Sequence, residues 1–414
     1  MSTSPRSTSS PPLLTLDEAL TRLLGAVGPV RAAETVSTFD ACGRVLAADV
    51  VSNLYVPSAD NTSMDGYALR CADVTQEGVV LPVSQRIPAG TVGAPLEAGS
   101  AARIFTGALV PAGADAIVMQ EHTEALDGAV RIDSVPRPGQ WIRRRGEDVE
   151  KGAVVLAAGG RLLPQSLGMA ASVGAGSLSV APRPRVALFS TGDELAMPGD
   201  VLKPGALYNS NRFTLRGLIE ALGCHCEDLG IVPDNLEATR AALRRAAAGN
   251  DLIVTCGGVS VGEEDHLKPA VNAEGRLDLW QIAIKPGKPL AFGEVRRDHG
   301  PPAWFIGLPG NPVSSFITFL LAVRPFLLKL QGATDCLPRP IVQRADFDWP
   351  RPDRRREFLR VRRNANGGLD LFRNQSSGVL TSVVWGDGVI DNPAGQVIRP
   401  GDPVAYLAFA ELLA

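Results

Sequence analysis

The sequence has no excess of basic residues, and this absence narrows the class of partners. Its 414 residues include 41 Lys and Arg and 44 Asp and Glu, which gives a formal net charge of -3 at pH 7. A general nucleic-acid-binding protein would carry a basic domain or a basic stripe. We therefore expect no nucleic-acid partner.

The sequence also lacks an uninterrupted run of about 18 apolar residues, the length that a membrane-spanning helix needs. The apolar segment 317–323 ends at Arg324 and Pro325, so we expect a buried helix there and no membrane partner. Residues 1–12 are rich in Ser, Thr and Pro and have no apolar core. This composition predicts a disordered tail rather than a signal peptide.

Cysteine is scarce, with six residues and no Cys-x-x-Cys pair. Without a secretory context, this pattern predicts reduced thiols and a cytoplasmic location. Cys224, His225 and Cys226 resemble a metal cluster at first sight. They lack a second ligand pair and lie where a predicted helix passes into a strand, so the pattern disfavours a zinc site.

What the sequence does contain is a regular alternation of strand and helix patterns over residues 184–335. Such an alternation predicts a doubly wound, mostly parallel α/β domain. Asp234 is the expected N-cap of the second helix. The predicted strands are residues 186–189, 228–232, 252–255 and 304–306, and the predicted helices are residues 211–222, 235–248 and 313–330.

The segments around this α/β domain have other patterns, so we expect a multidomain α/β protein. Residues 51–148 and 336–414 hold short apolar runs between Gly and Pro turns, which predicts two β-rich domains. Residues 13–50 begin with a helical pattern that a capping box precedes. We expect residues 149–183 to pack against this helix, so that 13–50 and 149–183 form one small helical and mixed domain that the first β-rich domain interrupts.

Three loops of the α/β domain directly follow predicted strands. They are residues 191–194 (Thr-Gly-Asp-Glu), 257–265 (Gly-Gly-Val-Ser-Val-Gly-Glu-Glu-Asp) and 308–314 (Leu-Pro-Gly-Asn-Pro-Val-Ser). In an open α/β sheet the loops after the strands open on one edge, where ligands bind. We therefore expect the three loops to converge on one site.

The first two loops carry the residue types that bind a metal ion and a phosphate. Three glycines within six residues of the second loop let backbone N–H groups approach a phosphate, although no Gly-Lys-Ser/Thr follows as in a P-loop. Carboxylates suit Mg²⁺, which prefers one or two of them together with phosphate and water. Asp193 and Glu194 are equally plausible from the pattern, and Asp265 is the expected second carboxylate.

Two lysines predict a site for a second anion. Lys285 and Lys288 flank a Pro-Gly turn, and each ammonium is a compact point charge. Ser314 lies at the start of the predicted helix 313–330, where free N–H groups favour anions. These residues together suggest an oxyanion pocket, and the alternative is that the lysine turn is only solvated.

The first β-rich domain adds three polar residues. Asp65 follows an expected turn and is left free by it, and Thr106 lies in an Ile-Phe-Thr-Gly segment. Asp148 follows the Arg triplet 143–145. An Arg triplet usually marks a solvated face, but one followed at once by Gly-Glu-Asp also suits a cleft.

Taken together and in order, six motifs resemble those of the MoeA family, which comprises the molybdopterin molybdenumtransferases and the E domain of gephyrin. The resemblance implies a four-domain, elongated homodimer with a MogA-like α/β domain. It also implies an enzyme that inserts molybdate into adenylated molybdopterin with Mg²⁺-dependent loss of AMP, and the adenylating enzyme of the same pathway is a further expected partner. The motifs are residues 61–68, 143–148, 190–195, 257–265, 284–289 and 307–314.

The resemblance also implies roles for residues of this sequence. Glu194 and Asp265 would hold Mg²⁺. Asp65, Thr106 and Asp148 would line the active cleft from the partner subunit. Two lysines, the serine at a helix start, and an arginine and a serine of the C-terminal domain would receive molybdate. The residues implied for substrate binding are Gly257, Gly258, Ser260, Gly262, Lys285, Lys288, Pro309, Gly310, Ser314, Arg360 and Ser377.

Two other functions stay open from the sequence. A gephyrin-like binding scaffold without turnover would use the same fold. A Mg²⁺-dependent nucleotide hydrolase would use the carboxylates and the glycine loop, but it would not need Lys285, Lys288 and Ser314 for a second anion. The twin lysines therefore favour the insertion reaction.

Overall fold

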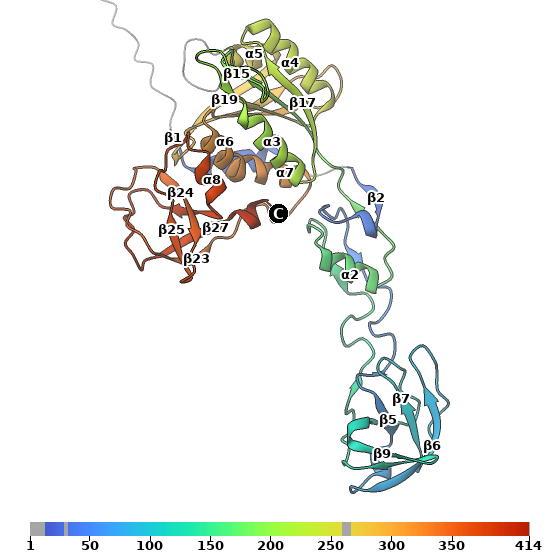
Figure 1. Ribbon diagram of the computed structural model, residues 1–414. Coiled ribbons are helices and arrows are strands. Elements are labelled where there is room, and N and C mark those ends of the chain that lie inside the picture. Colours follow the sequence, from blue (N-terminus) through green and yellow to red (C-terminus); the bar gives the residue numbers. More distant parts are fainter. Residues whose placement is uncertain (1–12, 29–31, 259–265, 414) are drawn as a thin grey trace, which may run out of the picture.

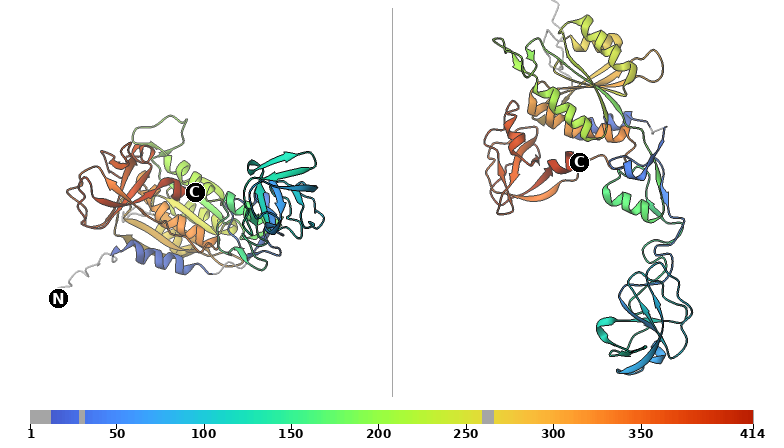
Figure 2. Two further views of the ribbon diagram at one scale, coloured as in Figure 1. Left: turned by 90° about the horizontal axis from the view of Figure 1, so that it is seen from below. Right: turned by 45° about the vertical axis from the view of Figure 1, so that its right-hand side comes forward.

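The structure, a computed structural model of the chain, describes residues 13–28, 32–258 and 266–413. Figure 1 shows an elongated molecule in which an α/β region and the C-terminal strands lie side by side at one end. A β-rich region lies at the other end, and a narrow middle region connects the two ends. The right-hand view of Figure 2 shows the same separation.

A seven-stranded sheet forms the centre of the α/β region, as far as the described residues show. Four of its six strand pairings are parallel and two are antiparallel. The parallel core agrees with the predicted fold class. In spatial order the strands are β1 (Leu13–Leu14), β19 (Gly275–Ile282), β21 (Pro289–Val295), β22 (Ala303–Leu308), β18 (Leu252–Cys256), β14 (Arg185–Thr191) and β17 (His225–Val232).

Helices cover both faces of this sheet, which confirms the doubly wound arrangement. Because side chains alternate along a strand, Val186 and Leu188 of β14 join the core on one face, and Ala187 and Phe189 join the core on the other. The first face carries α1 (Leu16–Ala26), α3 (Ser210–Ala221), α6 (Pro312–Thr318), the π-helical η4 (Phe319–Val323) and α7 (Arg324–Leu330), and the second carries α4 (Leu236–Gly249) and α5 (Leu267–Glu274).

The elements α6, η4 and α7 form one continuous helix. Within the described residues, Pro312–Leu330 is the one helix whose length and composition would suit a membrane span, and 89% of its apolar window is buried inside the protein. The whole η4 segment lies in the core. The buried helix predicted from residues 317–323 is therefore confirmed.

The N-terminal helix α1 belongs to the core of the α/β region. Thr15 is its N-cap and forms the predicted capping box with Glu18. Leu20 and Leu23 pack in the core that α1 shares with the sheet and α7. The predicted packing of residues 149–183 against this helix is wrong, because an amphipathic pattern shows which face is buried but not which surface covers it.

The middle region forms from two segments that flank the β-rich region in the sequence. Leu46, Leu162 and Leu178 lie in its core, and a second small core joins Val45 to Leu328 of α7. The pairs are β2 (Glu34–Ser37) with β13 (Ser177–Val180) and β3 (Val50–Val51) with β12 (Val154–Leu156), and α2 (Pro164–Ser172) contacts the 3-10 helix η1 (Thr38–Asp40).

The β-rich region contains a six-stranded sheet and a short strand pair. Apolar side chains fill both of its faces. In spatial order the strands are β8 (Ala116–Met119), β5 (Gly66–Leu69), β7 (Ala101–Ile104), β6 (Val79–Ile87), β10 (Ala129–Ile132) and β9 (Thr123–Leu126), and β4 (Asn61–Thr62) pairs with β11 (Ile142–Arg143).

The C-terminal region is a second β structure. Its strands close on themselves because β24 pairs with both β25 and β26. The two-residue strand β20 comes from the α/β region and pairs with β24. The elements are β20 (Ile284–Lys285), β24 (Arg356–Arg363), β25 (Gly368–Leu371), β23 (Ile341–Ala345), β27 (Pro403–Ala408) and β26 (Gly388–Asn392), with α8 (Thr381–Trp385) and α9 (Phe409–Leu413).

Candidate functional site

A cleft of about 1100 Å³ lies between the carboxyl edge of the central sheet and the C-terminal region. Its walls include the loops after β14, β18 and β22, which the sequence predicted to converge. The C-terminal region adds Arg355 and residues 375–378. The predicted site residues that line this cleft are Glu194, Gly257, Gly258, Lys285, Lys288, Pro309, Gly310, Ser314 and Ser377.

The two adjacent acids of the first loop have different positions. Glu194 lines the cleft, and its carboxylate lies over Gly192, where an added Cβ would be 2.6 Å from Glu194 Oε2. The φ angle of Gly192 is 141°, so this position favours glycine. Asp193 is not part of the cleft wall, and its Oδ1 accepts a hydrogen bond of 3.3 Å from the backbone N–H of Asp234. Asp193 thus holds a neighbouring loop in place.

Asp234 itself is not the N-cap that the sequence predicted. Asn235 caps α4, and its Oδ1 accepts a 2.9 Å hydrogen bond from the N–H of Ala238. Asp and Asn are both good N-caps, so their adjacency left the choice open. Asp234 lines the cleft instead.

The second loop lies only partly within the described residues. Gly257 and Gly258 line the cleft directly after β18. Ser260, Gly262 and Asp265, which the sequence predicted for this loop, lie outside the described residues. The predicted Mg²⁺ pair therefore stays a prediction.

The third loop leads into helix α6. Pro309 and Gly310 line the cleft, and so does Ser314 in the first turn of the helix. The N–H of Val313 donates a 3.0 Å hydrogen bond to the carbonyl of Ser377. One of the helix-start donors that the sequence assigned to an anion is therefore already used by the C-terminal region.

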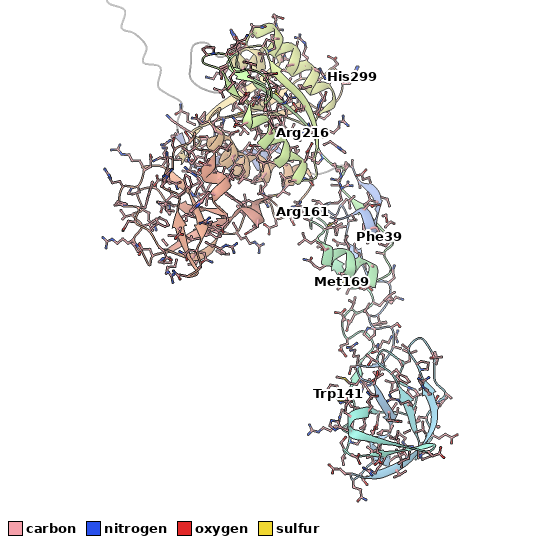
Figure 3. The ribbon with its side chains drawn as sticks, viewed as in Figure 1. Phe39, Trp141, Arg161, Met169, Arg216 and His299 are labelled. Atoms are coloured by element: carbon pink, nitrogen blue, oxygen red, sulfur yellow. The ribbon has the colours of Figure 1, made fainter. Side chains whose placement is uncertain are left out.

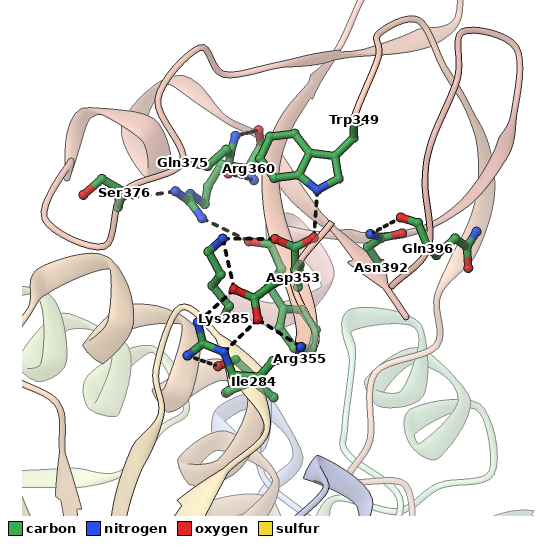
Figure 4. A network of polar contacts seen from close by, with 12 residues as sticks. Ile284, Lys285, Trp349, Asp353, Arg355, Arg360, Gln375, Ser376, Asn392 and Gln396 are labelled. Carbon is green, nitrogen blue, oxygen red and sulfur yellow. Dashed lines mark hydrogen bonds and ion pairs between the residues drawn. The ribbon is translucent and has the colours of Figure 1, made fainter. Parts of the chain in front are cut away.

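The two lysines of the cleft differ in their surroundings. Lys285 Nζ lies 3.3 Å from Glu357 Oε1 and 3.4 Å from Asp353 Oδ2, as Figure 4 shows for the network around it. Lys288 is exposed and makes no ion pair with a described residue. The cleft thus contains one lysine with fixed partners, Lys285, and one exposed lysine, Lys288.

The turn between the lysines packs against helix α6. Gly287 has a φ angle of 109°, and an added Cβ would lie 2.4 Å from Thr318 Oγ1. A larger residue could not keep this backbone so close to the helix. The contact therefore fixes where the two lysines emerge.

An arginine that the sequence did not single out lines the cleft. Arg355 donates to Asp353 Oδ1 from Nε at 3.0 Å and to Oδ2 from Nη2 at 3.1 Å, and these bonds hold the pKa of Asp353 well below its usual value. The predicted Arg360 is only 1% exposed and is not part of the wall. Its guanidinium donates to the carbonyl of Ser376 at 3.3 Å, and burial lowers its pKa to about 10.

The three predicted residues of the β-rich region are not in this cleft. Asp65 Oδ1 accepts hydrogen bonds from the backbone N–H and the hydroxyl of Thr106, at 2.7 and 2.8 Å, and these lower the pKa of Asp65. Asp148 is exposed in the same region. Trp141, which precedes β11, marks this region in Figure 3, away from the α/β region.

Comparisons with known proteins match three family models to successive parts of the chain. Residues 14–174 match the MoeA N-terminal region (domain I and II), residues 187–329 a probable molybdopterin binding domain, and residues 343–409 the MoeA C-terminal region (domain IV). A Haemophilus influenzae protein named molybdopterin molybdenumtransferase is 43% identical over 77% of this chain and 78% of its own length. The chain belongs to the MoeA family.

Other MoeA relatives agree with this assignment. Molybdopterin molybdenumtransferase 2 of Mycobacterium tuberculosis is 36% identical over 90% of this chain and 87% of its own length. A crystal structure of a molybdopterin biosynthesis moeA protein from Pyrococcus horikoshii matches with a TM-score of 0.83 and 29% identity, and covers 96% of this chain and 100% of that one. A Dictyostelium discoideum gephyrin is 30% identical, and the match covers 51% of its length.

The three family models divide the site residues among them. The N-terminal model spans Asp65, Thr106 and Asp148. The molybdopterin-binding model spans the three loops and both lysines, and the C-terminal model spans Arg355 and Ser377. The cleft therefore joins the last two parts, and no described residue of the first part lines it in the same chain.

The donor atoms of the cleft fit a Mg²⁺ ion only in part. No group of three His, Cys, Asp or Glu side chains that could hold a metal occurs among the described residues. The Glu194 carboxylate faces the cleft without a hydrogen-bond or ion-pair partner in the described part of the chain. A free carboxylate suits Mg²⁺ bound chiefly through phosphates and water.

The cysteine pair that resembled a metal cluster has the surroundings of buried thiols. Burial raises the pKa of Cys224 to about 12 and that of Cys226 to about 11. The Cys224 side chain lies in the core of the α/β region, and Cys226 packs against that core. Both side chains thus contribute to packing.

Proposed function

We propose that this chain inserts molybdenum from molybdate into adenylated molybdopterin, with Mg²⁺-dependent release of AMP. As a MoeA family member it is a transferase of molybdenum cofactor biosynthesis. The observation that carries the finer proposal is that one cleft holds two different kinds of polar wall. One has the carboxylate of Glu194 beside a glycine loop, and the other has Lys285, Lys288 and Arg355.

The two walls suit two different anions. Glycine backbone at Gly257 and Gly258 lets a phosphate approach, so we assign this wall to the pyrophosphate of the adenylated substrate. Glu194 and Asp265 would hold Mg²⁺, whose charge offsets the charge that develops as the phosphoanhydride breaks. The lysines and Ser314 suit a tetrahedral dianion such as molybdate, since ammonium groups form strong charge-assisted hydrogen bonds.

The proposal includes a second copy of the chain. Asp65, Thr106 and Asp148 of the partner subunit would complete the cleft, since in their own chain they lie outside it. The adenylating enzyme of the pathway would supply the substrate. All six cysteines are free thiols, which supports the proposed cytoplasmic location.

The test is an insertion assay with purified chain, adenylated molybdopterin, molybdate and Mg²⁺. Molybdenum cofactor and AMP should form in equal amounts, and omission of molybdate should stop cofactor formation. AMP release without cofactor would identify a nucleotide hydrolase. Substrate binding without either product would support the scaffold function instead.

A further inference from the structure

The backbone that carries Lys285 is part of the C-terminal sheet. Strand β20 pairs in parallel with β24, with Ile284 opposite Arg356 and Lys285 opposite Glu357. The N–H of Arg356 also donates a 3.0 Å hydrogen bond to the carbonyl of Ala283. The position of this lysine therefore depends on a strand that follows it by about 70 residues.

The side chain of Lys285 is held from the same strand and the segment before it. Its Nζ lies against the carboxylates of Asp353 and Glu357. Lys285 lines the cleft and these two carboxylates do not. An ammonium has three N–H donors. Glu357 Oε1 accepts one of them, Asp353 pairs with the ammonium from behind the wall, and donor capacity is left for the cleft.

Glu357 is built to hold one orientation. Its side chain is 1% exposed, and a buried carboxylate is costly unless it is paired and hydrogen-bonded. The indole N–H of Trp349 donates a 2.7 Å hydrogen bond to Glu357 Oε2, and Oε1 faces Lys285. Because an indole nitrogen can only donate, the two carboxylate oxygens have separate fixed partners.

The charges around Lys285 balance. Lys285 and Arg355 supply two positive charges, and Asp353 and Glu357 supply two negative charges. The ammonium therefore gives the cleft a hydrogen-bond donor in a fixed direction rather than a net positive charge. An oxyanion there must meet a donor in a set place, and Lys288 contributes the attraction.

We propose that Glu357, oriented by Trp349, is a positioning residue that aims the remaining N–H of Lys285 at the oxyanion in the cleft. Asp353, which Arg355 holds in turn, provides the second fixed contact. The inference rests on the proposed function in taking molybdate as this oxyanion. It adds a device by which the C-terminal region sets the geometry of a cation that belongs to the α/β region.

The test compares Glu357→Gln with Glu357→Asp in the full-length protein. In Glu357→Gln the amide oxygen must accept from Trp349, so the NH₂ group faces the Lys285 ammonium and displaces it. The Kd and KM for molybdate should then rise about tenfold, while AMP binding stays within about twofold of the wild type. Glu357→Asp keeps the charge and should show a smaller rise.

The matched control is Asp391→Asn. Asp391 pairs with Arg356 in the same sheet and does not contact Lys285, so this variant should bind molybdate as the wild type does. If Glu357→Gln does not fold, Asp353→Asn tests the same network at a more exposed position.

The outcomes separate the alternatives. Tighter or unchanged molybdate binding in Glu357→Gln would overturn the proposal, because loss of a nearby negative charge alone should strengthen anion binding. An equal weakening in Glu357→Asp or in the control would also overturn it. Direct molybdate binding by calorimetry needs no turnover, so wild-type protein that binds molybdate without making cofactor would refute the proposed function and leave this inference standing.

Discussion

The cleft and the β-rich region hold their site residues in different ways. In the cleft, Lys285 and Arg355 are fixed by carboxylates behind the wall, and one of these, Glu357, is buried. In the β-rich region, the carboxylate of Asp65 accepts its side-chain hydrogen bonds from Thr106. The first arrangement is ready for a ligand within one chain, whereas the second needs a facing surface.

This difference suggests that the two halves of the site depend on different contacts. The folded chain already fixes Lys285, which would bind molybdate, because two of its regions meet around this residue. The residues at the far end (Figure 1) can act only where another surface brings substrate to them. A homodimer would supply that surface, and the predictions below test each half separately.

The largest effect should come from the double substitution Lys285→Ala and Lys288→Ala. Loss of both ammonium groups should lower molybdate-dependent turnover on the order of 10²–10³-fold or more, as removal of preorganised donors does. Nucleotide binding should change little, and an insertion assay with parallel AMP titration measures both. Lys151→Ala, at an exposed position of the middle region, is the control. An equal loss of turnover and nucleotide binding would contradict the assignment of the two walls to two different anions.

Mixed dimers test whether the far half of the site comes from a second subunit. Asp65→Asn and Lys285→Ala should each be nearly inactive alone. Co-expressed with different tags, they should form heterodimers with one intact site, and random pairing should restore roughly a quarter of wild-type activity. Activity no higher than that of the separate variants would show that the two halves do not meet across subunits.

A smaller effect is expected from Gly287→Ala. The new Cβ would collide with Thr318, and the φ angle of 109° disfavours any side chain. The free energy of unfolding should fall by about 1–3 kcal/mol, with weaker molybdate binding because the lysine turn shifts. Gly217→Ala, on the exposed face of α3 with open space around it, should instead stabilise by about 0.5–1 kcal/mol. Urea unfolding of both variants checks this, and equal stabilities would contradict the packing argument.

The smallest effect concerns acid stability. Hydrogen bonds from Arg355 lower the pKa of Asp353 from its usual 3.8, so the folded state keeps this carboxylate charged after the unfolded state has bound a proton. The stabilisation is present above pH 4 or so and is lost as the pH falls below it. Asp353→Asn should therefore flatten the decline of unfolding free energy between about pH 5 and pH 3. An unchanged slope in urea titrations would show that the contact adds no stability.

The sequence predicted the converging loops well and their surroundings poorly. Buried parallel strands read as continuous apolar runs, so the loops that follow them could be placed together before the structure was known. The region that covers them could not, because pairing between β20 and β24 joins segments with no shared pattern. In the arginine-rich stretch 351–363, strand alternation turns Arg360 into the core and the residues before the strand place Arg355 at the cleft. Asp353, Glu357 and Trp349 had no motif to mark them.

The long helix Pro312–Leu330 has a mechanical consequence. Its 19 residues rise about 28 Å at 1.5 Å each. Ser314 near one end lines the cleft. Leu328 near the other end packs with Val45 of the middle region, which connects to the β-rich region. This one helix therefore sets the distance between the oxyanion pocket and the middle region. A change in its length would alter the distance between the two ends of the molecule.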